Sequence, residues 1–217
     1  MSLKEDLDKI RAHGSANERI RVAYEALVNQ LDRAETASHA LKVGDPMPTF
    51  LLPNAEGHLV FSDDLLNRGP LVVNFFRGIW CPYCRRTLET LEAALPRIQS
   101  AGGQLVALTP DTGSHLAGTK RKHGLTYEIL SDVDGAVGLQ CGVLFRAPDL
   151  YRQLLASVGV DLSERHGNEG WLIPMPATFV VDRTGIIRYA FVNADFTKRA
   201  EPDEIIEVLQ RLRSKAS

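Results

Sequence analysis

Two cysteines lie three positions apart in the segment RGIWCPYCRR, residues 77–86. A pair at this spacing can bind a metal, form a structural disulfide or act as a reactive dithiol. Zinc requires four ligands, but the only other cysteine is Cys141 and the six histidines are scattered. A structural disulfide across one helical turn would close too small a loop to constrain the chain. The pattern therefore favours a reactive pair that needs neither metal nor cofactor.

The position of Cys81 also predicts reactivity. It follows the apolar run PLVVNFF, residues 70–76, and precedes Pro82, which is typical of the first position of a helix. Free N–H groups at a helix start favour a thiolate, and nearby positive charge is supplied by Arg77, Arg85 and Arg86. Cys84, one turn deeper, can attack a sulfur at Cys81. We therefore expect Cys81 to be the nucleophile, Cys84 to resolve it and Trp80 to form a wall of the site.

The elements around this pair predict a mixed α/β fold. Residues 70–76 and 104–110 are apolar runs typical of buried strands, and an amphipathic helix separates them. A strand, helix and strand in this order predict two parallel strands. Residues 177–192 have the pattern of a β-hairpin, and a final helix begins at Pro202. A central mixed sheet flanked by helices accommodates this order.

The remaining segments predict additions to that sheet. Residues 43–63 are broken by prolines and a Glu-Gly turn, which indicates short edge strands. We expect a helix over residues 112–122, a short strand within 122–132, and an inserted helix and loop over 144–172.

A helix is expected at the N-terminus, from Ser15. Ser15 and Glu18 fit a capping box, and an apolar stripe follows on Ile20, Ala23, Tyr24, Leu27, Leu31 and Ala34. Two uses of this helix stay open, since it can cover the domain or pair two subunits in a homodimer.

Composition excludes several classes of partner. With 25 Lys and Arg against 27 Asp and Glu, the chain has a formal net charge of −2, which gives no footprint for nucleic acid or an anionic membrane. No apolar run approaches the ~20 residues of a membrane helix. The start of the sequence lacks the apolar stretch of a secretory signal. The three cysteines of the chain are too few, and odd in number, for a secreted protein held together by disulfides. We therefore expect a cytoplasmic protein, in which a disulfide is usually catalytic or sensing.

The segment VVNFFRGIWCPYCRRTLETL resembles the redox segment of thioredoxin-fold proteins. The Arg-Gly before Trp-Cys-Pro-x-Cys is most similar to peroxiredoxin-like members of the alkyl hydroperoxide reductase/thiol-specific antioxidant (AhpC/TSA) group. The resemblance begins near Val43 and includes PMPATFVVDRTGIIRYAFV and DFTKRAEPDEI. It implies a thioredoxin-like domain over residues 43–217, preceded by an N-terminal helical extension over residues 1–42.

The same resemblance assigns further residues. Cys81 matches the attacking thiol, and Pro176 matches a proline that is cis and faces the cysteine pair. Two departures stand out. Gly78 and Asn74 replace the hydroxyl residue and the proline of the peroxiredoxin motif before the cysteine, and Pro176 stands where peroxiredoxins place an arginine. Arg77 is a candidate for the missing guanidinium. Asn74 also replaces the buried aspartate of thioredoxin.

These observations predict a thiol-dependent antioxidant oxidoreductase that reduces hydroperoxides. Cys81 becomes a sulfenic acid, Cys84 condenses with it, and a thioredoxin- or glutathione-type donor restores both thiols. Two alternatives stay open. A protein disulfide oxidoreductase would use the same motif on a disulfide substrate, and a redox-sensing binding module would use the cysteines to control a partner at the N-terminal helix.

Overall fold

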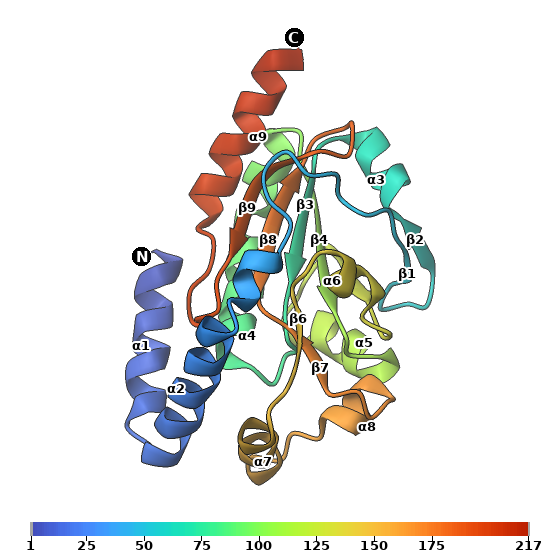
Figure 1. Ribbon diagram of the computed structural model, residues 1–217. Helices are drawn as coiled ribbons and strands as arrows, with labels where there is room; N and C mark the ends of the chain where they lie inside the picture. Colours follow the sequence, from blue (N-terminus) through green and yellow to red (C-terminus); the bar gives the residue numbers. More distant parts are fainter. Residues whose placement is uncertain (1, 217) are drawn as a thin grey trace.

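The computed structural model describes residues 2–216, and its centre is a five-stranded sheet in the order β5-β4-β3-β8-β9 (Figure 1). The strands β3, β4 and β5 are parallel, and β8 and β9 run antiparallel beside β3. The mixed sheet predicted from the sequence is thus confirmed. Its strands are β3 (Leu71–Phe75), β4 (Gln104–Thr109), β5 (Glu128–Ser131), β8 (Ala177–Val181) and β9 (Ile187–Val192).

Strand β3 is buried along its whole length, as its continuous apolar run predicts. Successive side chains point to opposite faces, so that Val72 and Val73 enter two different cores. The larger core receives side chains from α4 (Pro82–Ser100), α5 (Gly113–Lys122) and α9 (Pro202–Ala216). The smaller core lies under α3 (Ser62–Arg68) and α6 (Ala136–Gln140).

The N-terminus forms two helices, α1 (Leu3–Ser15) and α2 (Glu18–Arg33), rather than one helix from Ser15. Asn17 caps α2 by accepting a hydrogen bond from the N–H of Ile20 at 3.3 Å. The predicted Ser15–Glu18 capping box is wrong, because Glu18 is the first residue of α2 and Ser15 is the last of α1. The stripe on α2 is buried at Ala23, Leu27 and Leu31, half-buried at Ile20 and Tyr24, and exposed at Ala34, which follows the helix end.

Helices α1 and α2 lie side by side along the domain, and α1 packs against α4 (Figure 1). Leu3 and Leu7 are buried in the larger core. The N–H groups of Leu3 and Lys4 donate to the Glu201 carboxylate at 3.1 and 2.7 Å, where the positive end of the helix dipole favours an anion. In this chain the two helices cover the domain's own core. A homodimer and a boundary at residues 42/43 stay predictions.

The 144–172 insertion rises from a two-stranded ribbon of β6 (Leu144–Arg146) and β7 (Leu172–Pro174). Between them lie α7 (Asp149–Ser157) and α8 (Leu162–His166). The Trp171 indole N–H donates to the Ser163 hydroxyl at 2.9 Å, and the Arg152 guanidinium lies 3.9 Å from the centre of its ring. Trp171 therefore fixes α8 and α7 to the base of the insertion.

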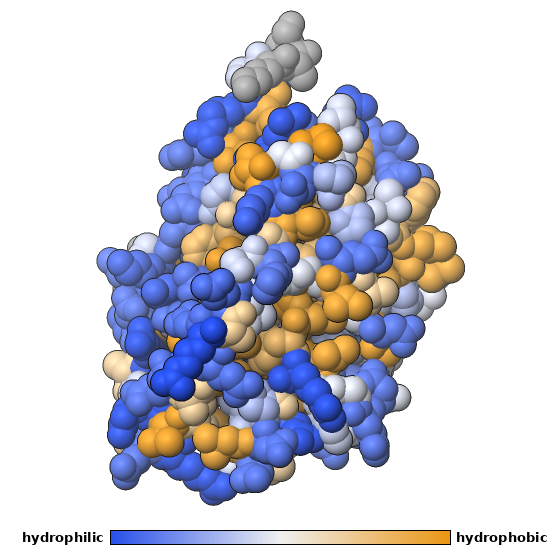
Figure 2. Space-filling view, viewed as in Figure 1, coloured by the Kyte–Doolittle hydropathy of each residue, from blue (hydrophilic) through white to orange (hydrophobic). Residues whose placement is uncertain are grey.

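The edge elements include η1 (Thr36–His39) and the antiparallel strands β1 (Leu51–Pro53) and β2 (Leu59–Phe61). Apolar side chains gather at the surface over β1 and β2 (Figure 2), where Leu51, Leu59 and Phe61 are exposed. Within residues 2–216, no helix is long and apolar enough to cross a lipid bilayer.

Candidate active site

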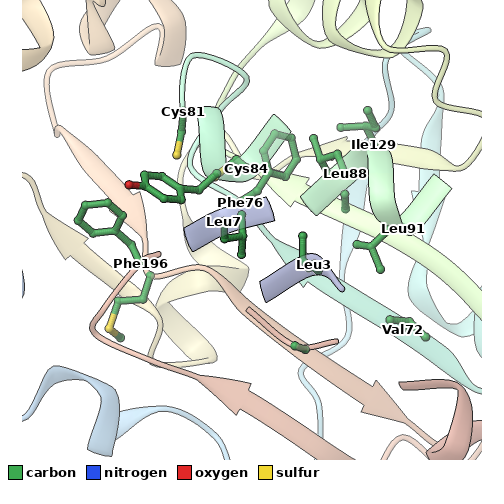
Figure 3. Close-up of a cluster of buried hydrophobic side chains, with 14 of the residues drawn as sticks. Leu3, Leu7, Val72, Phe76, Cys81, Cys84, Leu88, Leu91, Ile129 and Phe196 are labelled. Atoms are coloured by element: carbon green, nitrogen blue, oxygen red, sulfur yellow. The ribbon is translucent and has the colours of Figure 1, made fainter. Parts of the chain in front are cut away.

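Cys81 lies where the chain leaves the sheet and α4 begins. It is the N-cap of α4, Pro82 follows in the first turn, and Cys84 lies inside the helix. Both thiols are free and both residues are 0% exposed. In Figure 3, they belong to the same cluster of buried side chains as Phe196 and as Leu7 of α1. The strand-to-helix junction therefore holds both sulfurs inside the larger core.

Arg77, in the loop after β3, directs its guanidinium at the Cys81 sulfur. Nη2 donates to Cys81 Sγ at 2.8 Å, and Nη1 donates to Tyr151 Oη at 2.7 Å. The Arg77 guanidinium carbon lies 3.9 Å from the centre of the Phe196 ring and 5.3 Å from that of Trp80. Arg77 is itself 0% exposed, so its two hydrogen bonds and the stacked ring hold it in one orientation.

The surroundings of the two sulfurs shift their pKa values in opposite directions. Burial raises the pKa of Cys81, but the hydrogen bond from Cys84 and the positive charges of Arg77 and Arg199 outweigh it and hold this pKa well below its ordinary value. Burial raises the pKa of Cys84 well above the ordinary value, and its hydrogen bond to Cys81 and the Cys81 charge add to this effect. The pair is therefore a thiolate at Cys81 and a thiol at Cys84.

Arg199 is a second guanidinium at this site, and sequence reasoning assigned it no role there. It lies in the segment between β9 and α9, where its Nη2 is 3.7 Å from Cys84 Sγ. Its Nη1 donates to the carbonyl oxygens of Phe196 and Lys198. A signal for it existed in the family-like segment DFTKRAEPDEI, but no local pattern links that segment to a cysteine more than a hundred residues earlier.

An aromatic roof closes the site, formed by the rings of Tyr24, Tyr83, Tyr151 and Phe196. The Tyr24 and Phe196 rings meet edge to face with centroids 4.9 Å apart, and Tyr24 lies 6.4 Å from Tyr83 and 6.2 Å from Tyr151. A cavity of about 220 Å³ outside the roof is lined by Tyr24, Tyr83 and Phe196, together with residues of α1 and α2. The N-terminal helices and the 144–172 insertion thus both contribute to the site.

The loop before Cys81 is built around Gly78. Its φ is +138°, and a Cβ there would lie 2.3 Å from the Trp80 indole nitrogen. The Asp111 carboxylate accepts a hydrogen bond from the N–H of Ile79 and pairs with Arg165 of α8. A side chain such as the hydroxyl residue of typical peroxiredoxins cannot occupy position 78 while Trp80 packs in this way. Trp80 is half-buried, beside the cysteine loop.

Two expectations about this site are wrong. Pro176 is trans, since residues 2–216 contain no cis peptide bond. Its segment runs from the end of β7 directly into β8 and has no tight turn, the usual setting of a cis proline. The charges expected from Arg85 and Arg86 are also placed elsewhere. Arg85 is exposed and Arg86 binds Asp6 of α1 at 2.6 Å, so that Arg77 and Arg199 surround the sulfurs instead.

Two other side chains singled out by the sequence, Asn74 and Cys141, do not take part in the thiol chemistry of the site. Asn74 is buried and accepts a hydrogen bond from the Thr178 hydroxyl at 3.1 Å, but an amide cannot relay protons as a buried aspartate does. Cys141 lies in the smaller core, with its Sγ 3.9 Å from Met47 Sδ. Among the described side chains, no group of three or more His, Cys, Asp or Glu is arranged to hold a metal ion.

A buried thiolate that accepts a hydrogen bond from a neighbouring thiol can give up two electrons and close a disulfide. That chemistry defines a thiol-based oxidoreductase. Residues 43–190 match the model of the AhpC/TSA family, and the chain therefore belongs to this family. It is a peroxiredoxin-like thiol peroxidase, an enzyme class that uses a peroxide substrate and a thiol reductant.

Similar proteins agree with this assignment. Chloroplastic peroxiredoxin Q from Suaeda salsa is 26% identical over 182 residues, which cover 83% of this chain and 74% of that protein. Peroxidoxin BcpB from Mycobacterium tuberculosis superposes with a TM-score of 0.61 at 22% identity, over 79% of this chain and 97% of that one. A peroxiredoxin-like protein from Aquifex aeolicus gives a TM-score of 0.61 at 16% identity, over 80% and 88%. The structural matches confirm the thioredoxin-like fold.

Proposed function

We propose that this protein reduces hydroperoxides in the cytoplasm with Cys81 as nucleophile and Cys84 as resolving thiol. The contact of Arg77 Nη2 with Cys81 Sγ at 2.8 Å carries the proposal, because it keeps a buried sulfur ionised and aims a hydrogen-bond donor at the place where a peroxide oxygen must arrive. The cytoplasmic location is supported by the low cysteine content.

The reaction proceeds in two steps. The Cys81 thiolate attacks one oxygen of the peroxide O–O bond and becomes a sulfenic acid, and the other oxygen leaves as an alkoxide that takes a proton and departs as an alcohol. The Cys84 thiol then attacks the Cys81 sulfur, a disulfide forms and water leaves. The first turn of α4 favours this step, since cysteines three positions apart on one helix lie at a separation that a disulfide can span. A thioredoxin- or glutathione-type thiol restores the pair.

Burial of both sulfurs favours peroxide over a protein disulfide. With both cysteines 0% exposed, a polypeptide disulfide must displace more of the aromatic roof to meet the attacking Cys81 sulfur than a hydroperoxide does. A hydroperoxide is far smaller and needs a smaller opening. The trans Pro176 further weakens the disulfide oxidoreductase alternative.

The test compares peroxide and insulin-disulfide turnover on one preparation. We expect substoichiometric peroxide to give a Cys81–Cys84 disulfide, located by peptide mass mapping. Cys84→Ser should keep the first peroxide reaction, accumulate sulfenic or over-oxidised Cys81, and lose multiple turnover. Cys81→Ser should lose both reactions. Faster turnover of insulin than of peroxide would assign the protein to disulfide reduction, and turnover of neither would assign it to sensing.

A further inference from the structure

The two guanidinium groups at the sulfurs occupy unequal positions. Arg77 is 0% exposed and lies against Cys81, whereas Arg199 is 8% exposed and lies against Cys84. Among residues 2–216, no carboxylate lies within 4.0 Å of either guanidinium, as every ion pair in this part of the chain involves other residues. The Cys81 thiolate is thus the anion in direct contact with this buried positive charge.

Oxidation removes that anion. A Cys81–Cys84 disulfide is neutral, so that both arginines are left buried beside it with no negative partner in contact. A buried charge that loses its partner is strongly unfavourable. The oxidised site therefore attracts an incoming anion. Such an anion meets Arg199 first, because Arg199 lies nearer the surface than Arg77.

The two sulfurs also differ as leaving groups. A thiolate that attacks Cys84 Sγ expels Cys81 as a thiolate, directly onto the Arg77 donor and the start of α4. Attack on Cys81 would instead expel Cys84, which lies within the helix and whose sulfur is 3.7 Å from Arg199 Nη2, farther than Cys81 Sγ is from its Arg77 donor. In thiol–disulfide exchange, the better-stabilised thiolate leaves faster.

We propose that Arg199 selects an anionic thiol as electron donor and directs it to Cys84. This inference rests on the proposed function, since it concerns the reductive half of the same cycle. The donor thiolate forms a mixed disulfide with Cys84, and the bond between the two protein sulfurs breaks as Cys81 leaves with the electron pair. A second donor thiolate then attacks the donor sulfur of the mixed disulfide, releases the oxidised donor, and leaves Cys84 to take a proton.

The experiment starts from full-length protein oxidised to the Cys81–Cys84 disulfide with diamide, so that it does not depend on peroxide. Three probe thiols reduce it at equal thiolate concentration: anionic 2-mercaptoethanesulfonate, neutral 2-mercaptoethanol and cationic 2-aminoethanethiol. After an acid quench and alkylation, peptide mapping should place the adduct on Cys84. The anionic probe should react about tenfold faster than the cationic one at low ionic strength, and this ratio should fall as salt is added.

Variants assign the effect to Arg199. Arg199→Gln should bring the ratio close to one, Arg199→Lys should retain most of it, and Arg85→Gln, which removes an exposed charge next to Cys84, should leave it unchanged. Adduct on Cys81, a ratio that does not respond to salt, or an unaltered ratio in Arg199→Gln would overturn the proposal. The salt series on the unmodified protein decides the matter if Arg199→Gln does not fold. Failure of peroxide to form the disulfide would count against the proposed function alone.

Discussion

Cys81 and Cys141 are both 0% exposed, yet their surroundings drive their sulfurs to opposite states. Cys141 lies in the smaller core against Met47, where burial and the Asp132 charge raise its pKa to about 12. Cys81 lies in the larger core, where burial also raises its pKa, but the hydrogen bond from Cys84 and the charges of Arg77 and Arg199 outweigh burial and hold this pKa well below the ordinary value. Burial by itself makes a thiol inert, and a directed guanidinium reverses that effect.

The largest expected effect comes from removing that guanidinium. In Arg77→Met, the Cys81 sulfur loses the charge in direct contact with it while burial still opposes ionisation, so its pKa should rise towards the ordinary value of about 8.5, at which about 3% thiolate remains at pH 7. The peroxide reaction should slow by up to about 30-fold at pH 7 and should recover as pH rises, whereas the wild type should stay flat across neutral pH. Thiolate absorbance at 240 nm against pH checks the cause.

Arg85→Met is the matched control, since it removes an arginine four positions from Cys81 that does not contact the sulfur. It should titrate like the wild type. If Arg77→Met instead keeps its thiolate absorbance at pH 7, then Arg77 is not what separates Cys81 from Cys141.

A smaller effect is expected from Tyr151→Phe, which removes the acceptor of the Arg77 Nη1 hydrogen bond. A buried donor left without its partner should lower the free energy of unfolding by about 1–3 kcal/mol. The guanidinium loses one of its two anchors but keeps its charge, so that the peroxide rate should fall by about tenfold or less. Urea unfolding and the 240 nm titration measure the two effects separately.

Tyr127→Phe provides the comparison for that variant. The buried Tyr127 hydroxyl donates to the Leu88 carbonyl oxygen at 3.1 Å, and Tyr127 has no contact with the sulfurs. It should lose stability without any change in the Cys81 titration. Equal titration curves for the two variants would show that Tyr151 does not position Arg77.

The smallest effect is expected from a change at Cys141, the inert cysteine of this comparison. Cys141→Ser should keep peroxide turnover within about twofold of the wild type and lose about 1–2 kcal/mol of stability, because a hydroxyl replaces a buried sulfur. In the folded wild type, an alkylating reagent at neutral pH should modify Cys81 before Cys141. Loss of turnover in Cys141→Ser would instead give Cys141 a part in the resolving step.

Local patterns predicted the framework that holds Cys81. The apolar run at 70–76 became the central strand, and Pro82 marked the start of α4, because strand burial and helix initiation depend on neighbouring residues. The hairpin at 177–192 and the insertion at 144–172 were found for the same reason.

The partners of the sulfurs could not be predicted in this way. Tyr151 reaches the site through the packing of α7, and Arg199 through the packing of the segment before α9. Such tertiary contacts leave no periodic pattern in the sequence. Two wrong assignments, the Ser15 cap and the cis Pro176, have local causes instead. Ser15 lost its capping role to Asn17, which stands directly before Glu18, and Pro176 proved trans within an extended segment.

The complete enclosure of Cys81 and Cys84 has a kinetic consequence. A sulfur that water cannot touch is equally beyond the reach of hydrogen peroxide, so that every catalytic cycle must include a transient parting of Tyr24 and Phe196 or their neighbours. Motions of this kind usually take microseconds to milliseconds. The observed rate constant for Cys81 oxidation should therefore level off at high peroxide concentration, at a plateau that is the same for different small hydroperoxides and equals the frequency of opening.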